Sequence, residues 1–270
     1  MRGLLRKTCI EVRWPVVLFG IGLALVMSLL TALLPKVLSD IDRIFDKLPF
    51  VKPLLTALLG VDPGHGFTAQ MMQAFLWVHP TVLSLIWAHA LMYCTRVPAA
   101  EIDRGSIDFL LGLPISRWKL HTAELIGFAA TGIVILSIGY TGHWLASASL
   151  QPGMRPSAYA TFCVLSNLFA VYLAVGGFTF LVSSASDRRG RAIGVMFAVL
   201  LLSFLLNFVA QFWEAVKSFS FLSIMEYYRP AQTIQAGEFP WQDVMILLAV
   251  AATSWTAGGI ILRRRNICTV

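Results

Sequence analysis

The sequence predicts an all-α integral membrane protein with six transmembrane helices. Three observations support this fold class. First, 57% of the 270 residues are apolar and only 13% are charged, about half the charged share of a soluble domain; a soluble core would need more polar surface to cover it. Second, six apolar stretches are each long enough to cross a hydrocarbon layer about 30 Å thick. Third, the basic residues concentrate on one side of these stretches.

The six predicted spans are 15–34, 75–95, 125–148, 159–183, 192–212 and 244–262. We expect helices because each backbone polar group in lipid needs an internal partner, and the alternating pattern of barrel strands is not seen. Fourteen of the 21 Lys and Arg residues lie on the side that carries both termini. The positive-inside rule therefore predicts that both termini are cytoplasmic.

The remaining segments belong to the same single transmembrane domain, 1–270. Residues 1–14 have apolar positions on one helical face and basic residues beside it, which is typical of an interfacial amphipathic helix. An ordinary basic flank fits this stretch equally well. Because the apolar run that follows is longer than a signal core, we expect it to be retained as the first span. The outer segments 35–74 and 213–243 predict short helices near the membrane surface.

A short charged segment, 98–117, separates the second and third predicted spans. At 100° per residue, Glu101, Arg104, Gly105 and Asp108 share one narrow stripe of an amphipathic helix. Pro98 and Pro114 suit the start and end of that helix, and Ser116 suits a cap on the next one. Since Gly costs about 1 kcal/mol relative to Ala within a helix, Gly105 predicts the close approach of another backbone. A helix that is broken at Gly105 is the alternative.

This segment resembles the permease subunits of ABC transporters of the type-2 exporter class. Their pattern in outline is Glu, then Gly-Thr, Leu-Leu and Pro-x-Ser-Arg. The matching stretches here are Glu101, Gly105-Ser106, Leu110-Leu111 and Pro114-Ile115-Ser116-Arg117, with Ser106 in place of the usual Thr. The resemblance implies that 98–117 is a coupling helix that docks on a cytoplasmic ATPase subunit. The residues implied in that contact are Glu101, Arg104, Gly105, Asp108, Pro114 and Arg117.

The same resemblance implies an assembly in a bacterial-type inner membrane. Two permease copies, identical or homologous, would pair with two ATP-binding subunits that bind ATP and Mg, while this chain would bind no cofactor or metal itself. The chain contains no G-x-x-x-x-G-K-[ST] loop, so ATP hydrolysis is expected from the separate subunit. The centres of the spans carry no Asp, Glu, Lys or Arg, which argues against a proton relay. No basic run interleaved with aromatics suggests nucleic acid.

Three polar residues of the second and fifth spans, His89, Asn207 and Gln211, are candidates for a substrate path. The resemblance implies it, because those spans border the central cavity in that family. Hydrogen bonding within the helix bundle is the default role for such residues, and metal ligation by His89 is a further alternative. Two other functions stay open. A membrane-embedded enzyme acting on lipid or peptide would need a nucleophile–base or metal constellation, and a non-transporting anchor would use the charged segment equally well.

Overall fold

The computed structural model describes residues 2–48, 51, 69–112 and 114–267, and the described residues form helices and no strand. The six long stretches are α1 (Arg2–Lys47), α3 (Ala69–Val78) with α4 (Pro80–Cys94), α7 (Arg117–Ser147), α8 (Ala158–Ala185), α9 (Arg189–Ala210) and α12 (Trp241–Arg264). The short helices are η1 (Arg96–Ala100), α5 (Glu101–Asp103), α6 (Ile107–Leu111), η2 (Pro152–Met154), α10 (Glu214–Lys217), η3 (Ser220–Leu222), η4 (Ile224–Tyr227) and α11 (Pro230–Ala236).

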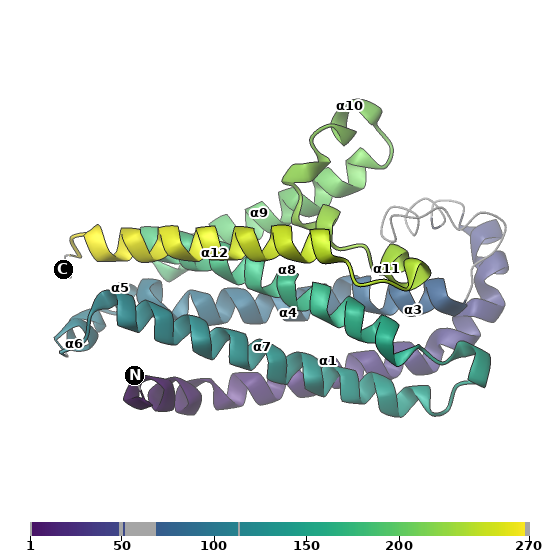
Figure 1. Ribbon diagram of the computed structural model, residues 1–270, viewed down its shortest axis with the longest axis horizontal. Helices are drawn as coiled ribbons and strands as arrows, with labels where there is room; N and C mark the ends of the chain where they lie inside the picture. The colour runs from purple at the N-terminus through teal and green to yellow at the C-terminus, as the bar shows by residue number, and fades with distance from the viewer. Residues whose placement is uncertain (1, 49–50, 52–68, 113, 268–270) are drawn as a thin grey trace.

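Six of these stretches are long and apolar enough to cross a membrane, so the predicted fold class is confirmed. The helical bundle extends along one direction, with both chain ends and α5–α6 together at one end and α3, α10 and α11 at the other (Figure 1). We call these the terminal end and the far end. The short helices expected in 213–243 are also present. Of the predicted outer segment 35–74, residues 35–47 continue α1 and residues 69–74 belong to α3, while 49–50 and 52–68 lie outside the described residues.

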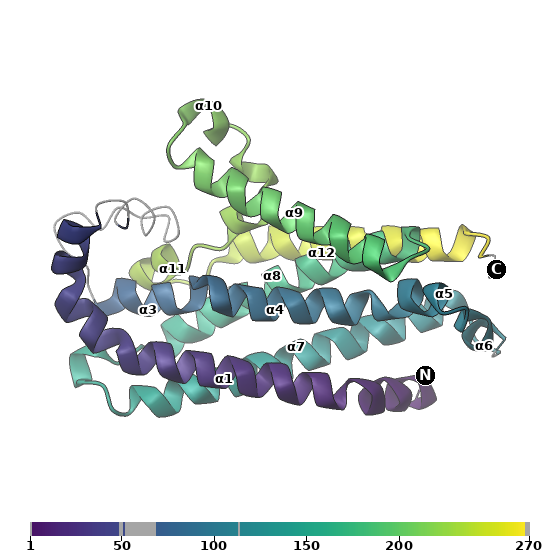
Figure 2. The same cartoon turned by 180° about the vertical axis from the view of Figure 1, so that it is seen from behind.

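The first helix differs from the prediction. Residues 2–14 do not form a separate interfacial helix, because α1 continues without interruption from Arg2 to Lys47, with Pro15 and Pro35 inside it. Proline removes one backbone hydrogen bond and bends a helix, but it does not always end the helix. Beyond Pro35 the last turns of α1 lie across the far end, turned away from the direction of the first part (Figures 1 and 2).

The second predicted span, 75–95, is also not one helix. It is divided into α3 and α4 at His79, whose backbone is extended with φ −55° and ψ 132°. Pro80 explains the break, because a residue that precedes proline is disfavoured in the α region. The His79 ring compensates for the interruption, since its Nδ1 accepts a hydrogen bond from the Thr81 N–H at 3.3 Å.

Two helix pairs form the tightest parts of the bundle, α1 with α7 and α8 with α12. Glycine permits both contacts. A Cβ built on Gly142 of α7 would lie 2.4 Å from the Ala24 carbonyl oxygen of α1, and one built on Gly177 of α8 would lie 2.6 Å from that of Ala251 in α12. Close backbone approach at small residues is the usual basis of helix packing in membranes. By contrast, α9 leaves the bundle toward its protruding end at α10 (Figure 2).

Candidate functional site

The charged segment between the second and third spans folds as short helical turns, and not as the single helix expected for 98–117. Val97 is extended, at φ −130° and ψ 127°, so the helical turns begin at Pro98 as predicted. They continue through α5, break at Arg104–Gly105 and resume in α6. Ser116 then caps α7, because its Oγ accepts the Lys119 N–H at 3.2 Å. The predicted cap is thus confirmed.

Gly105 marks the break between the two helices. Its φ is +71°, a left-handed conformation that glycine adopts at least cost. A Cβ at this position would meet no atom within 4 Å. The alternative of a helix broken at Gly105 is therefore correct, and the close approach of a partner's backbone at Gly105 stays a prediction. Ser106 closes the turn, since its N–H donates to the Glu101 carbonyl at 2.9 Å and its hydroxyl bonds the Glu101 carboxylate.

The break changes which side chains face outward at the tip. A small buried cluster of Ile102, Ile107 and Leu110 holds α5 and α6 together and packs against Ile267 near the C-terminus. Phe109 lies outside the predicted charged stripe, yet it is 83% exposed. Asp103, Arg104 and Asp108 of the same segment are also exposed.

Arg117 has a different place from the other predicted contact residues. Its Nη1 donates to the carbonyl oxygens of Leu262 at 3.0 Å and Arg265 at 2.6 Å, which fastens the start of α7 to the end of α12. Arg265 extends this connection to the end of α8, donating to the carbonyls of Ser184 and Ser186 at 3.0 Å each. The structure therefore uses Arg117 as an internal anchor, whereas Pro114 is exposed.

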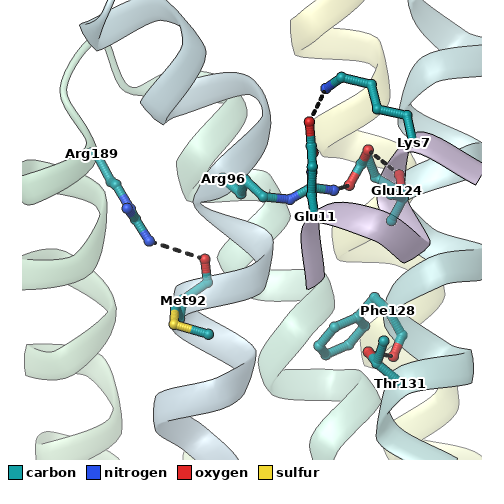
Figure 3. A network of polar contacts seen from close by, with 9 residues as sticks. Lys7, Glu11, Met92, Arg96, Glu124, Phe128, Thr131 and Arg189 are labelled. Atoms are coloured by element: carbon teal, nitrogen blue, oxygen red, sulfur yellow. Dashed lines mark hydrogen bonds and ion pairs between the residues drawn. The ribbon is translucent and has the colours of Figure 1, made fainter. Parts of the chain in front are cut away.

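A buried ion-pair network lies directly behind the segment, and the sequence reasoning missed it. Arg96 forms ion pairs with Glu11 of α1 and Glu124 of α7 (Figure 3). The side chain of Glu124 is only 6% exposed, and it also accepts the Thr8 hydroxyl at 3.1 Å. Lys7 pairs with the outer side of Glu11 at 2.8 Å. We call Arg96, Glu11 and Glu124 with Thr8 and Lys7 the Arg96 network.

The Arg96 network stabilises the charged form of the Arg96 guanidinium at a site that is mostly shielded from water. Burial alone would lower the pKa of the Arg96 guanidinium, but the Glu124 carboxylate, with Tyr93 and Glu11, raises it. Arg96 also lies over the Tyr93 ring at 5.3 Å. It therefore joins three helices at the point where the second span passes into the charged segment. The sequence signal for this network is that Arg96 directly follows the second predicted span, while Glu11 and Glu124 come shortly before the first and third spans.

Arg189, at the start of the fifth span, connects α9 to the charged segment and to the end of α4. Its backbone N–H donates to the exposed carboxylate of Asp103 at 3.3 Å. Its guanidinium donates to the Thr95 hydroxyl and to the Met92 carbonyl, both at 3.3 Å. In Figure 3, Arg189 approaches the end of α4 from α9, whereas Arg96 leaves the same region toward α1 and α7.

Two hollows meet beside Arg189. The first, the polar cavity, has a volume of about 420 Å³, and its lining includes Glu11, His89, Arg96, Glu101, Arg104 and Arg189. The second, the apolar groove, measures 570 Å³ and runs between α4 and α9. Met92 and Arg189 line both. The two hollows are therefore adjacent.

The three candidates for a substrate path do not lie together. His89 is 1% exposed and shares a 3.0 Å hydrogen bond with the Tyr172 hydroxyl inside an aromatic cluster. His89 is also one of the residues that line the polar cavity. Asn207 donates to Glu226 at 3.3 Å, and Gln211 lines a separate 430 Å³ pocket near α10. Only His89 therefore borders the hollows beside Arg189. Within the described residues, no group of three or more His, Cys, Asp or Glu is placed to hold a metal ion.

Comparison with known proteins adds one finding to this geometry. The family model described as ABC-2 family transporter protein matches residues 51–238. The matched region contains the charged segment, the apolar groove and Arg96 with Glu124. No curated protein matches the chain.

Proposed function

Because the chain belongs to the ABC-2 family of transporter proteins, we propose that this permease is driven by a separate ATP-binding subunit that docks on α5–α6. The chain is a multi-pass transmembrane component of an ABC transporter. It has no phosphate-binding loop of its own. The energy for transport would therefore come from a partner.

The exposed face of α5–α6 is the observation that carries this proposal. It combines the charged residues Asp103, Arg104 and Asp108 with Phe109, which is 83% exposed. An aromatic anchor within a polar rim is typical of the centre of a protein interface. Glu101 supports the contact indirectly, because its carboxylate is engaged with Ser106 inside the turn. Gly105 gives the turn its shape, and Pro114 stands at the exposed end of the segment.

The network behind α5–α6 supports a coupling role. Movement of the segment would reach α1 and α7 through Arg96, and α9 through the contact between Asp103 and Arg189. In this proposal the terminal end is cytoplasmic, in keeping with its excess of basic residues. The transporter would contain two permease copies and two ATP-binding subunits in a bacterial-type inner membrane. The exposed apolar side chains of α9, such as Phe197 and Leu202, suit contact with lipid or with the second copy.

Site-specific photo-crosslinking tests the docking contact. A benzoyl-phenylalanine at position 109 of the full-length chain, in its native membrane, should crosslink to a protein that carries a phosphate-binding loop. The matched control is Phe219, which is 56% exposed and lies beyond α10 near the far end; a crosslinker there should give no such adduct. Absence of the adduct at 109, or equal adducts at both positions, would refute the proposed contact.

Crosslinking alone does not distinguish a permease from a non-transporting anchor, so transport must be measured separately. An anchor would crosslink at 109 and would move no cargo when ATP is added. A permease would crosslink and would also release bound cargo on ATP hydrolysis. The hollows beside Arg189 are where such cargo would bind, and their chemistry limits what it can be.

A further inference from the structure

The junction of the polar cavity and the apolar groove has two chemically different sides. The groove is lined from α4 by residues such as Leu83, Trp87 and Leu91, and from α9 by Ile193, Phe197 and Phe204. Ile193 and Phe204 are 11 positions apart, which corresponds to about 16 Å along a helix axis. A narrow apolar groove of that length suits an extended hydrocarbon chain.

The charges of the polar cavity are unevenly paired. Arg96 is neutralised by Glu11 and Glu124, and the Glu101 carboxylate is occupied by Ser106. The guanidinium of Arg189, in contrast, donates only to the neutral oxygens of Thr95 and Met92. Within the described part of the chain, neither Arg104 nor the Arg189 side chain forms an ion pair. Three arginines and the two glutamates Glu11 and Glu101 line the cavity, so its lining carries one net positive charge next to the groove.

We propose that these two hollows together bind one amphiphilic molecule, with its anionic headgroup in the polar cavity beside Arg189 and Arg104 and its hydrocarbon chain in the apolar groove. This names a substrate class and rests on the proposed transport function. A neutral apolar compound would leave the arginine charges unmatched. A sugar or small anion would leave the groove unfilled. An anionic amphiphile satisfies both sides of the junction.

Lipid binding to the purified full-length chain tests the site without any ATP-binding subunit. The probes are dioleoyl phosphatidylglycerol and dioleoyl phosphatidylcholine, which share their chains and differ in net charge, and retention is measured by native mass spectrometry. We expect the anionic lipid to be retained at least tenfold more than the zwitterionic one. Equal retention of the two lipids would overturn the proposal.

Matched arginine variants locate the charge effect. Arg189→Gln should reduce the preference for the anionic lipid at least tenfold, whereas Arg191→Gln, at an exposed position of the same helix, should leave it unchanged. Arg189→Lys retains the charge and should retain most of the preference. If Arg191→Gln is equally damaging, the attraction is general surface electrostatics. If folded Arg189→Lys loses as much as Arg189→Gln, Arg189 is only structural. Either result contradicts the proposed site.

A groove variant tests the chain-binding half. Ala88 is exposed and lines the groove, so Ala88→Trp should fill it and lower retention of both lipids, while Ala88→Ser should not. Unchanged retention in a folded Ala88→Trp protein would overturn the chain-binding half of the proposal.

Addition of ATP to the assembled transporter then distinguishes cargo from a resident membrane lipid. Cargo should be released, and a lipid that stays bound throughout turnover would refute the substrate assignment. If no ATP-binding subunit assembles, the proposed function fails, while the binding measurements still decide whether the site exists.

Discussion

Replacement of Arg96 by methionine should destabilise the bundle more than any other single change in the Arg96 network. The substitution keeps a long side chain but removes both ion pairs. Glu124, whose side chain is 6% exposed, would then retain only the Thr8 hydroxyl. Removing one partner of a buried ion pair costs about 3–5 kcal/mol, and we expect about 3 kcal/mol because Glu124 keeps its hydrogen bond from Thr8.

The exposures of the two carboxylates predict an order of effects. Glu11 is 36% exposed and keeps Lys7 as a partner, so Glu11→Gln should cost less than about 1 kcal/mol. The stability loss caused by Glu124→Gln should fall between those of Glu11→Gln and Arg96→Met, because Arg96 would still pair with Glu11. In the double variant Arg96→Met with Glu124→Gln, the loss should be about 1–3 kcal/mol smaller than the sum of the single losses.

Reversible unfolding in mixed lipid–detergent micelles, followed by circular dichroism, measures these differences. Two results would contradict the expected order of stabilities. One is a Glu11→Gln loss as large as that of Arg96→Met, which would mean that burial does not decide the strength of the pairs. The other is strict additivity of Arg96→Met and Glu124→Gln, which would mean that the two side chains do not interact.

Three glycines give further predictions. Gly177→Ala should cost at least about 2 kcal/mol of stability, because its Cβ would lie 2.6 Å from the backbone oxygen of Ala251. The control Gly190→Ala should be neutral or slightly stabilising, because a Cβ there would meet no atom within 4 Å. Equal unfolding free energies for the two variants would contradict this. Gly105→Ala should destabilise the α5–α6 turn by about 1 kcal/mol, because Ala is strained at φ +71°, and hydrogen exchange of residues 101–111 should speed up. Unchanged exchange there would show that the turn does not depend on glycine.

The apolar lengths and the charge distribution of the sequence were sufficient to predict the six spans and the placement of both termini at one end. The breaks within helices were harder. Pro80 and Gly105 interrupt helices, whereas Pro15 and Pro35 lie inside α1. Residue type alone does not decide between these outcomes, because neighbouring helices determine whether an interrupted hydrogen bond can be tolerated.

The sequence predicts a charged segment between the second and third spans, and the structure exposes Asp103, Arg104 and Asp108 there. That this surface contacts an ATP-binding subunit stays a prediction. The sequence did not reveal that Phe109 is exposed, because the exposure of an apolar side chain in a short broken helix depends on how the segment folds. Nor did it reveal the Arg96 network, whose members are separated by 28 and 85 positions along the chain. Such partners become neighbours only after the helices pack.

The decisive measurement for ATPase docking on α5–α6 is the coupling between ATP hydrolysis and cargo release in the purified transporter. Phe109→Asp places a charge at the exposed centre of α5–α6, and Phe219→Asp makes the same change near the far end. Phe109→Asp should insert normally but lower ATP-dependent release at least tenfold, while Phe219→Asp should release cargo like the unmodified protein. Normal ATP-dependent release by Phe109→Asp would contradict docking on α5–α6.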